Sequence, residues 1–211
     1  MNGVLFLWLA WLIIIYAYFL MDHSKKRTFT LVFSLSTIIL SLWSYTFFSI
    51  EWNLAFVPFL FLCIDSMTKL NRNQLIVGFI ISIFIAYWFW LIHNAIYLEP
   101  VWLLLSPISM ILGVSIPLLI IIIRNLYTRI FSLIIGFFQG ITLTSLLVTV
   151  ELGMTAEALH NISGMFLLDV ISLALIIILF WSRLEMFAQK IKEKIIATNQ
   201  PISKKQTNMN V

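Results

Sequence analysis

The chain has 211 residues, of which 62% are hydrophobic and 10% are charged, and its mean hydropathy is +1.04. These values exclude an ordinary soluble domain and predict a membrane protein with one bundle of helices and no room for a separate soluble domain. The formal charge of +4 does not indicate a nucleic-acid partner, because the basic residues follow hydrophobic runs, where they set membrane topology.

Hydrophobic runs separated by polar breaks predict an all-α, polytopic bundle of seven transmembrane helices with short loops. Only helices and closed barrels satisfy their backbone hydrogen bonds in lipid. The predicted spans are residues 4–21, 29–50, 53–68, 75–92, 101–123, 130–150 and 162–182. The first run has no basic residue before it and a basic cluster after it, which is the reverse of a secretory signal peptide, so we expect it to be retained. We assign residues 1–182 to the seven-helix transmembrane domain.

The third run is the weakest prediction, because it is short and contains Pro58 and Asp65. A re-entrant segment is the alternative to a full span. The positions of Lys and Arg favour seven full spans, since basic residues are retained on the cytoplasmic side of a membrane. With seven spans, all thirteen fall on one side: Lys25, Lys26, Arg27, Lys69, Arg72, Arg124, Arg129, Arg183, Lys190, Lys192, Lys194, Lys204 and Lys205. This pattern predicts an outside N-terminus and a cytoplasmic C-terminus.

Residues 183–211 are predicted to form a cytoplasmic basic tail. Apolar residues recur at helical spacing from Leu184 to Ile195, with lysines between them. This pattern is typical of an amphipathic helix on anionic lipid, and a solvated helical extension is the alternative. The residues after Ala197 are polar, and we expect them to be disordered.

Asp169 lies inside the apolar part of the last run, where an ionisable side chain is costly and faces a partner or a water-filled cavity. We expect Asp169 to contact polar groups on neighbouring helices, with Gln139 the other intramembrane polar candidate. Further candidate partners are Thr142, Thr144, Ser34, Ser36, Thr37, Ser41 and Ser44. Two interpretations stay open: Asp169 stabilises the bundle through hydrogen bonds, or it is a proton or cation site of a transporter.

Two further features of the predicted helices concern packing. Gly136 and Gly140 in the segment GFFQG have the small-xxx-small spacing that lets two helices approach closely, which indicates helix packing. Pro107 and Pro117 in the fifth run predict a kink.

Candidate metal ligands lie in the predicted outer loops: His93, Glu99, Glu151, Glu157 and His160. Their spacing matches no metal-binding signature, and a solvated loop is the competing interpretation. The sequence has no nucleophile elbow and no glycine-rich phosphate loop, so we expect no enzyme, no cofactor and no metal.

The opening Met1-Asn2-Gly3, the segment Trp8-Leu9-Ala10-Trp11, the basic break Lys25-Lys26-Arg27 and the overall length resemble the YphA family of Bacillus-type bacteria. Its members are small multi-pass membrane proteins without an assigned activity. The resemblance implies the cytoplasmic membrane of an endospore-forming bacterium and a part in spore formation. It supplies no catalytic or binding residues.

The sequence therefore favours a non-enzymatic integral membrane protein of the bacterial cell membrane that supports envelope or spore assembly. The alternative is a small-solute or ion transporter that uses Asp169. The expected partners are the lipid bilayer, other membrane proteins or a second copy of the chain.

Overall fold

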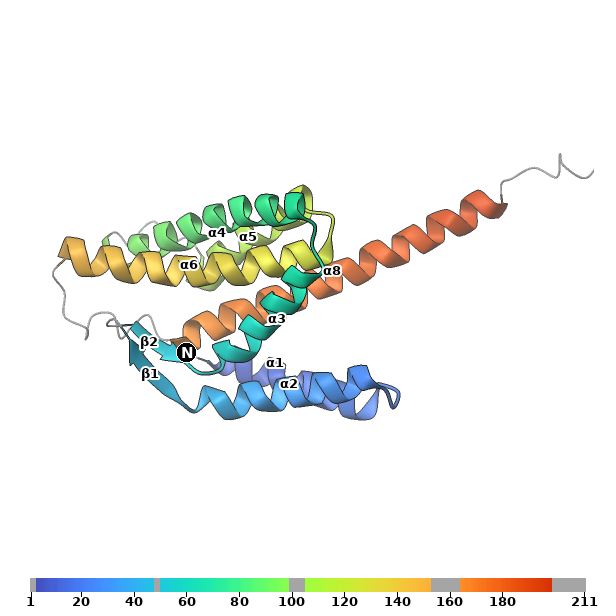
Figure 1. Ribbon diagram of the computed structural model, residues 1–211, viewed down its shortest axis with the longest axis horizontal. Helices are drawn as coiled ribbons and strands as arrows, with labels where there is room; N and C mark the ends of the chain where they lie inside the picture. Colours follow the sequence, from blue (N-terminus) through green and yellow to red (C-terminus); the bar gives the residue numbers. More distant parts are fainter. Residues whose placement is uncertain (1–2, 48–49, 99–104, 153–163, 199–211) are drawn as a thin grey trace, which may run out of the picture. The chain divides into compact units, whose positions relative to one another are not determined.

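The computed structural model describes residues 3–47, 50–98, 105–152 and 164–198 (Figure 1). These residues form seven helices and one hairpin, which confirms the predicted all-α class. The helices are α1 (Val4–Phe19), α2 (Lys25–Ser41), α3 (Phe56–Thr68), α4 (Arg72–Leu98), α5 (Pro107–Ile122), α6 (Leu126–Leu152) and α8 (Gly164–Thr198). The chain forms two compact units, Met1–Ile178 and Leu179–Val211.

Three of the described helices are long and apolar enough to cross a membrane, over Arg72–Ala95, Leu126–Leu146 and Gly164–Ile195. The apolar helices α1, α3 and α5 are shorter, with 16, 13 and 16 residues. At about 1.5 Å per residue, a helix as short as α3 covers about 20 Å of a hydrocarbon core that is about 30 Å thick. Length and composition thus support three spans directly, and seven full spans stay a prediction.

The predicted helix over residues 29–50 is wrong in its second half. The helix α2 ends at Ser41, and the chain then forms an antiparallel hairpin of β1 (Ser44–Phe47) and β2 (Ile50–Asn53), with Ser44 paired to Asn53 and Phe47 paired to Ile50. These strands are rich in aromatic and β-branched residues, which favour extended backbone. The predicted start of the third helix at residue 53 is also too early, because α3 begins at Phe56.

Local capping fixes where two of the helices begin. The Ser24 hydroxyl accepts the Arg27 N–H at 3.4 Å at the start of α2, and Ser106 caps α5 in the same way through Ser109. Pro107 is the first residue of α5, where a proline needs no N–H donor, so the predicted kink at this residue is wrong. Pro117 lies inside the helix, as expected.

The first part of α8 lies inside the bundle of the first unit. All six residues of the segment 167–172 are buried, so this part of the helix is covered on every side. Leu167, Leu168 and Ile171 belong to a hydrophobic core shared with α1, α3, α4, α5 and α6. Asp169 is carried into the protein interior by this segment.

The helix α8 continues to Thr198, so the described residues of the basic tail are helical. Within the second unit, Trp181 Nε1 donates to Glu185 Oε1 at 2.7 Å, one helical turn along the chain. The apolar side chains of the tail are exposed at spacings of three and four: Leu184, Phe187, Ile191 and Ile195. The predicted disorder after Ala197 falls largely on residues outside those described.

Candidate functional site

Asp169 is fully buried and binds the start of the first helix. Asp169 Oδ2 accepts the Gly3 backbone N–H at 2.9 Å, and Asp169 Oδ1 accepts the Phe6 backbone N–H at 2.7 Å. Gly3 is the N-cap residue of α1, and Phe6 is the third residue within the helix. The first backbone N–H groups of a helix have no partner inside it. Both oxygens of this one carboxylate therefore satisfy donors that lipid could not satisfy.

Asp169 makes the two hydrogen bonds of a capping box, although it belongs to α8 and not to α1. In a capping box, the N-cap side chain accepts the N–H of the third helical residue, and that residue accepts the N-cap N–H. Glycine at the N-cap and phenylalanine at the third position supply neither acceptor, and Asp169 supplies both. Asp169 also lies at the positive end of the α1 dipole, where acidic side chains are favoured.

Glycine is favoured at position 3 by its backbone conformation, and the Met165 side chain leaves little room for a Cβ atom. Its φ of 86° lies in the left-handed region, which residues with a side chain rarely adopt. A Cβ atom there would also lie 2.9 Å from Met165 Sδ. Met165 precedes Asp169 by four residues, so both side chains face Gly3 from the same face of α8.

The predicted partners of Asp169 are wrong. Gln139 Oε1 instead accepts the Ser82 hydroxyl from α4 at 3.1 Å. Five of the other predicted hydroxyls donate to carbonyls of their own helices: Thr142 to Phe138, Thr144 to Gly140, Ser36 to Phe33, Thr37 to Ser34 and Ser41 to Ile38. The partners of Asp169 are backbone N–H groups at a helix start, which no side-chain pattern in the sequence indicates.

Asn53 connects the hairpin to the same region. Its side-chain amide donates to the Ser41 carbonyl at 2.8 Å and to Met165 Sδ at 3.8 Å, and its Oδ1 accepts the Ala55 N–H at 2.8 Å. The side chain is buried, although the sequence placed Asn53 at the membrane surface. The end of α2, the start of α3 and α8 thus meet beside Gly3.

Arg129 is a second buried charge at a helix end. Its Nε donates to the Ile123 carbonyl at 2.6 Å, and its Nη2 donates to the Ile120 carbonyl at 3.2 Å. These carbonyls belong to the last turn of α5 and its C-cap, where a cation is favourable. Arg129 was expected in a cytoplasmic loop, but it lies in α6 and caps the neighbouring helix.

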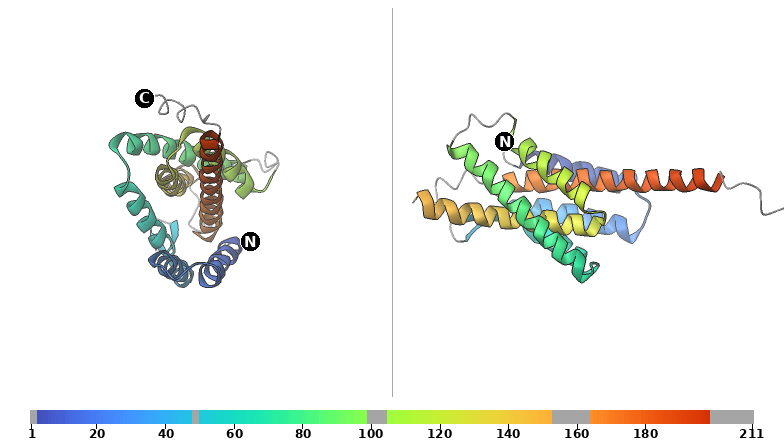
Figure 2. Two further views of the ribbon diagram at one scale, coloured as in Figure 1. Left: turned by 90° about the vertical axis from the view of Figure 1, so that its right-hand side faces the viewer. Right: turned by 90° about the horizontal axis from the view of Figure 1, so that it is seen from above.

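The helices α4 and α6 cross at close range and share the most extensive helix contact in the described residues (Figure 2). A Cβ on Gly136 would lie 2.8 Å from Ile85 Cβ and 3.0 Å from the Ser82 carbonyl oxygen. A Cβ on Gly140 would lie 3.0 Å from the Cβ and the ring of Phe89. The same α6 face carries a buried small residue at every fourth position, namely Thr128, Ser132, Gly136, Gly140 and Thr144.

A comparison with protein families assigns the chain to one family. A family model described as YphA-like integral membrane protein matches residues 2–207. The chain belongs to this family. The resemblance inferred from the sequence is thereby confirmed, as is the prediction of a membrane protein. No curated protein matches, and no solved structure matches.

In this YphA-like chain, the predicted outer metal ligands are only partly described. His93 is buried rather than exposed in a loop, and its ring stacks on Phe89 at a centroid distance of 5.7 Å. The side chains of Glu99, Glu151, Glu157 and His160 lie outside the described residues. Within the described ranges, no three His, Cys, Asp or Glu side chains come together as a metal site.

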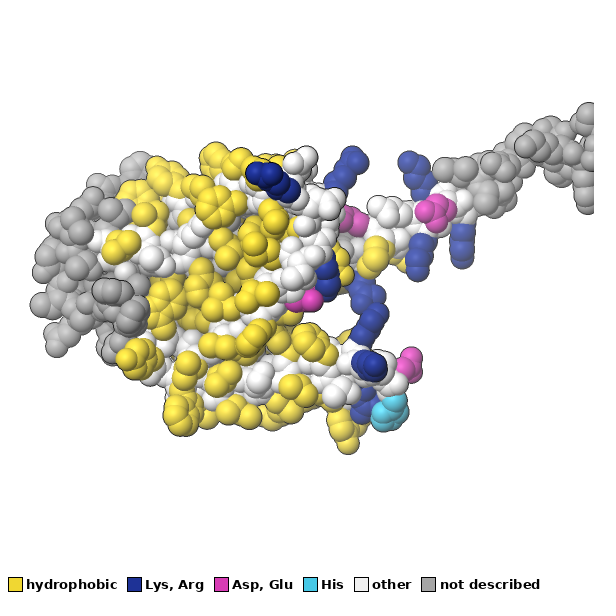
Figure 3. Space-filling model, in the orientation of Figure 1, with side chains coloured by type: hydrophobic (Ala, Val, Ile, Leu, Met, Phe, Trp, Pro, Cys, Tyr) yellow, Lys and Arg dark blue, Asp and Glu magenta, His cyan; other side chains and the backbone are white. Residues whose placement is uncertain are grey.

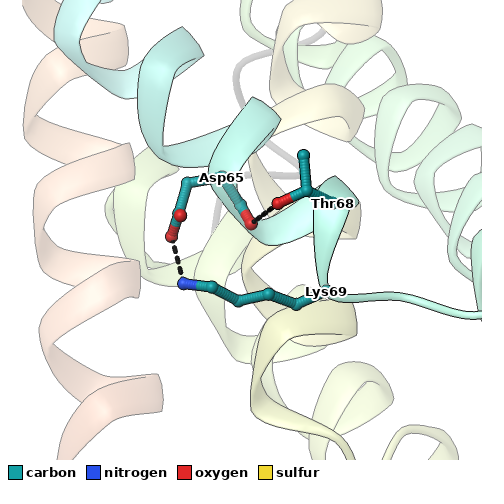
Figure 4. A network of polar contacts seen from close by, with 3 residues as sticks. All are labelled: Asp65, Thr68 and Lys69. Atoms are coloured by element: carbon teal, nitrogen blue, oxygen red, sulfur yellow. Dashed lines mark hydrogen bonds and ion pairs between the residues drawn. The ribbon is translucent and has the colours of Figure 1, made fainter.

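Basic side chains gather at one end of the first unit, and hydrophobic side chains cover the face beside them (Figure 3). Near this end, Lys69 Nζ donates to Asp65 Oδ2 at 2.5 Å, and the Thr68 hydroxyl donates to the Asp65 carbonyl (Figure 4). The hydrogen bond to Asp65 raises the pKa of Lys69 above its ordinary value. Lys69 therefore stays positively charged throughout the neutral pH range.

Proposed function

We propose that this chain is a non-catalytic multi-pass protein of the bacterial cell membrane, and that it supports envelope or spore assembly through contacts in the membrane. One observation carries the proposal: both oxygens of Asp169 bind the backbone at the start of α1. The carboxylate that first suggests transport thus has a structural task. We further propose that the partners are lipid, other membrane proteins or a second copy of the chain.

A transport role for Asp169 is the alternative, and the geometry disfavours it. A proton or cation site in a membrane faces a water-filled path or a bound substrate. Asp169 has no exposed surface, and its oxygens are engaged by two N–H groups. Protonation or cation binding would weaken the hydrogen bonds that these oxygens accept, and with them the cap at the start of α1.

We also propose seven full spans with the N-terminus outside and the C-terminus in the cytoplasm. The basic end of the first unit supports this orientation, because Lys and Arg are retained inside. At the other end, the α2–α3 connection is a hairpin with exposed Trp43 and Tyr45, which are residues that favour the membrane interface. Each strand of the hairpin is paired along one edge only, so we place the hairpin at the membrane interface, where water can bind the backbone groups of the other edge.

The proposal is tested by comparing phenotype with protein level in cells for Asp169→Asn and Gly3→Ala. The first variant removes the charge, and the second leaves the carboxylate in place but disturbs its partner. If Asp169 is structural, both variants lower membrane abundance, and a phenotype follows abundance in both. A normal amount of Asp169→Asn protein with a deletion phenotype, beside a functional Gly3→Ala protein, would instead establish a chemical role for the carboxylate.

A further inference from the structure

An open groove of about 600 Å³ lies between α2 and α3. Its walls are apolar side chains that include Phe29, Val32 and Leu40 of α2 and Val57 and Phe61 of α3. The exposed fractions of Phe29, Val32 and Phe61 are 60%, 61% and 67%. In a membrane, such a groove is filled by hydrocarbon, either from the acyl chain of a lipid or from the side chains of another helix.

The groove has a charged mouth at one end. Lys25 and Lys26 precede Phe29 by four and three residues, so they continue the groove face of α2 by one turn. On α3, Asp65 lines the groove, and Lys69 follows four residues later and binds it. Lys69 also lies 4.8 Å from the centre of the Tyr127 ring, which holds its ammonium group near the end of α3.

We propose that the groove binds one anionic phospholipid, with an acyl chain against Phe29, Val32 and Phe61 and the phosphate between the lysines. Lysines at the end of a membrane helix reach the headgroup region, where anionic lipid attracts them. Phosphatidylglycerol fits this mouth, because its phosphate pairs with ammonium groups and its hydroxyls can donate to Asp65. The long axis of the lipid then follows the two helices, from the basic end toward Leu40 and Val57.

A second copy of the chain fits the groove less well than a lipid. Two copies in the same membrane orientation would bring their Lys25, Lys26 and Arg27 clusters together without an intervening anion. Juxtaposed like charges oppose association. A phospholipid supplies the hydrocarbon and the negative charge in one molecule.

The test uses the full chain in phosphatidylcholine nanodiscs that contain a small share of phosphatidylglycerol with a photoreactive acyl chain. Crosslinks are mapped by mass spectrometry. We expect them at Val32 and Phe61, with competition by unlabelled phosphatidylglycerol and little competition by phosphatidylcholine. The double variant Lys25→Gln/Lys26→Gln should lower labelling by about fivefold per lysine. The matched tail variant Lys190→Gln/Lys192→Gln should leave labelling of the groove unchanged.

Two further variants test whether the groove is blocked by a large side chain and whether it is filled by a second copy of the chain. Ser36→Trp places a large side chain in the groove and should abolish the labelling of Phe61. Phe61→Cys in a Cys63→Ala background reports contact between copies through disulfide crosslinking. Equal labelling of the groove and of exposed Phe84 on α4 would overturn the proposal, as would efficient Phe61→Cys crosslinking or unchanged labelling of the lysine variant. None of these results depends on the function proposed above.

Discussion

Asp169 and Gly3 are joined by a 2.9 Å hydrogen bond between positions 166 residues apart in the chain. The bond links the last helix to the start of the first, so α1 lacks its cap until α8 is in place. An acidic and a basic side chain each bind a helix end in this bundle. Asp169 binds the positive end of α1, and Arg129 binds the negative end of α5.

Gly136→Ala should destabilise the protein by about 1–3 kcal/mol, because the added methyl group has no room beside Ile85 and the Ser82 carbonyl. Unfolding by SDS from mixed micelles measures the change. Gly113→Ala is the matched control, since a Cβ on Gly113 has nothing within 4 Å. This control should be neutral or slightly stabilising, because alanine favours a helix more than glycine does. Equal losses for the two variants would show that α4 and α6 do not need this close approach.

Arg129→Gln should lower the stability by about 2–4 kcal/mol, because the variant leaves carbonyls at the end of α5 with fewer donors. Arg124→Gln is the matched control, because Arg124 is exposed in the same connection. Thermal unfolding in detergent, followed by tryptophan fluorescence, measures both. An Arg129→Gln protein as stable as the control would show that the guanidinium does not cap α5.

The sequence predicted the existence of most helices better than it predicted what holds them together. Apolar runs long enough to cross lipid indicate α4, α6 and α8 whatever their neighbours are. The hairpin was not predicted because its aromatic and apolar residues, such as Tyr45 and Ile50, continue the apolar run of α2 and also occur in membrane helices. The small-xxx-small pattern of Gly136 and Gly140 predicted that α6 packs closely against another helix. The residues that face these glycines, Ser82, Ile85 and Phe89, form no sequence pattern that identifies α4 as the partner.

The partner of Asp169 could not be read from the sequence. A buried carboxylate signals that donors are near, but backbone N–H groups are present at every position. Only the meeting of α8 with the start of α1 makes Gly3 and Phe6 the donors. A glycine just before the first apolar run was the one available clue.

Cysteine labelling in whole cells tests the proposed topology, in a Cys63→Ala background. Ser44→Cys should label from outside, because Ser44 is exposed in the hairpin, whereas Asn53 is too buried to serve as a reporter. Asn71→Cys lies at the basic end and should label only after lysis. Labelling of Asn71→Cys in intact cells would reject the seven-span orientation.

The tail helix should bind anionic membranes. Its exposed Leu184, Phe187 and Ile191 form an apolar stripe, and each nearby lysine contributes about 1 kcal/mol at an anionic surface. A peptide of residues 183–196 should bind phosphatidylglycerol vesicles and be released by high salt. Equal binding to neutral vesicles would remove the electrostatic part of this prediction.

A double-mutant cycle between Gly3 and Asp169 tests most directly whether Asp169 works by holding α1. The free energy of unfolding is measured in mixed micelles for Gly3→Ala, Asp169→Asn and the pair. Each single variant should cost about 1–3 kcal/mol: Asp169→Asn replaces one of the two acceptor oxygens by a donor, and Gly3→Ala keeps its N–H but strains the left-handed backbone that aims this N–H at the carboxylate. The pair should cost about 1–2 kcal/mol less than the sum, since each change weakens the same hydrogen bonds between Asp169 and the start of α1. Gly113→Ala combined with Asp169→Asn is the control and should be additive. Additive costs for Gly3→Ala and Asp169→Asn would contradict the account, because the carboxylate and the start of α1 would then contribute independently.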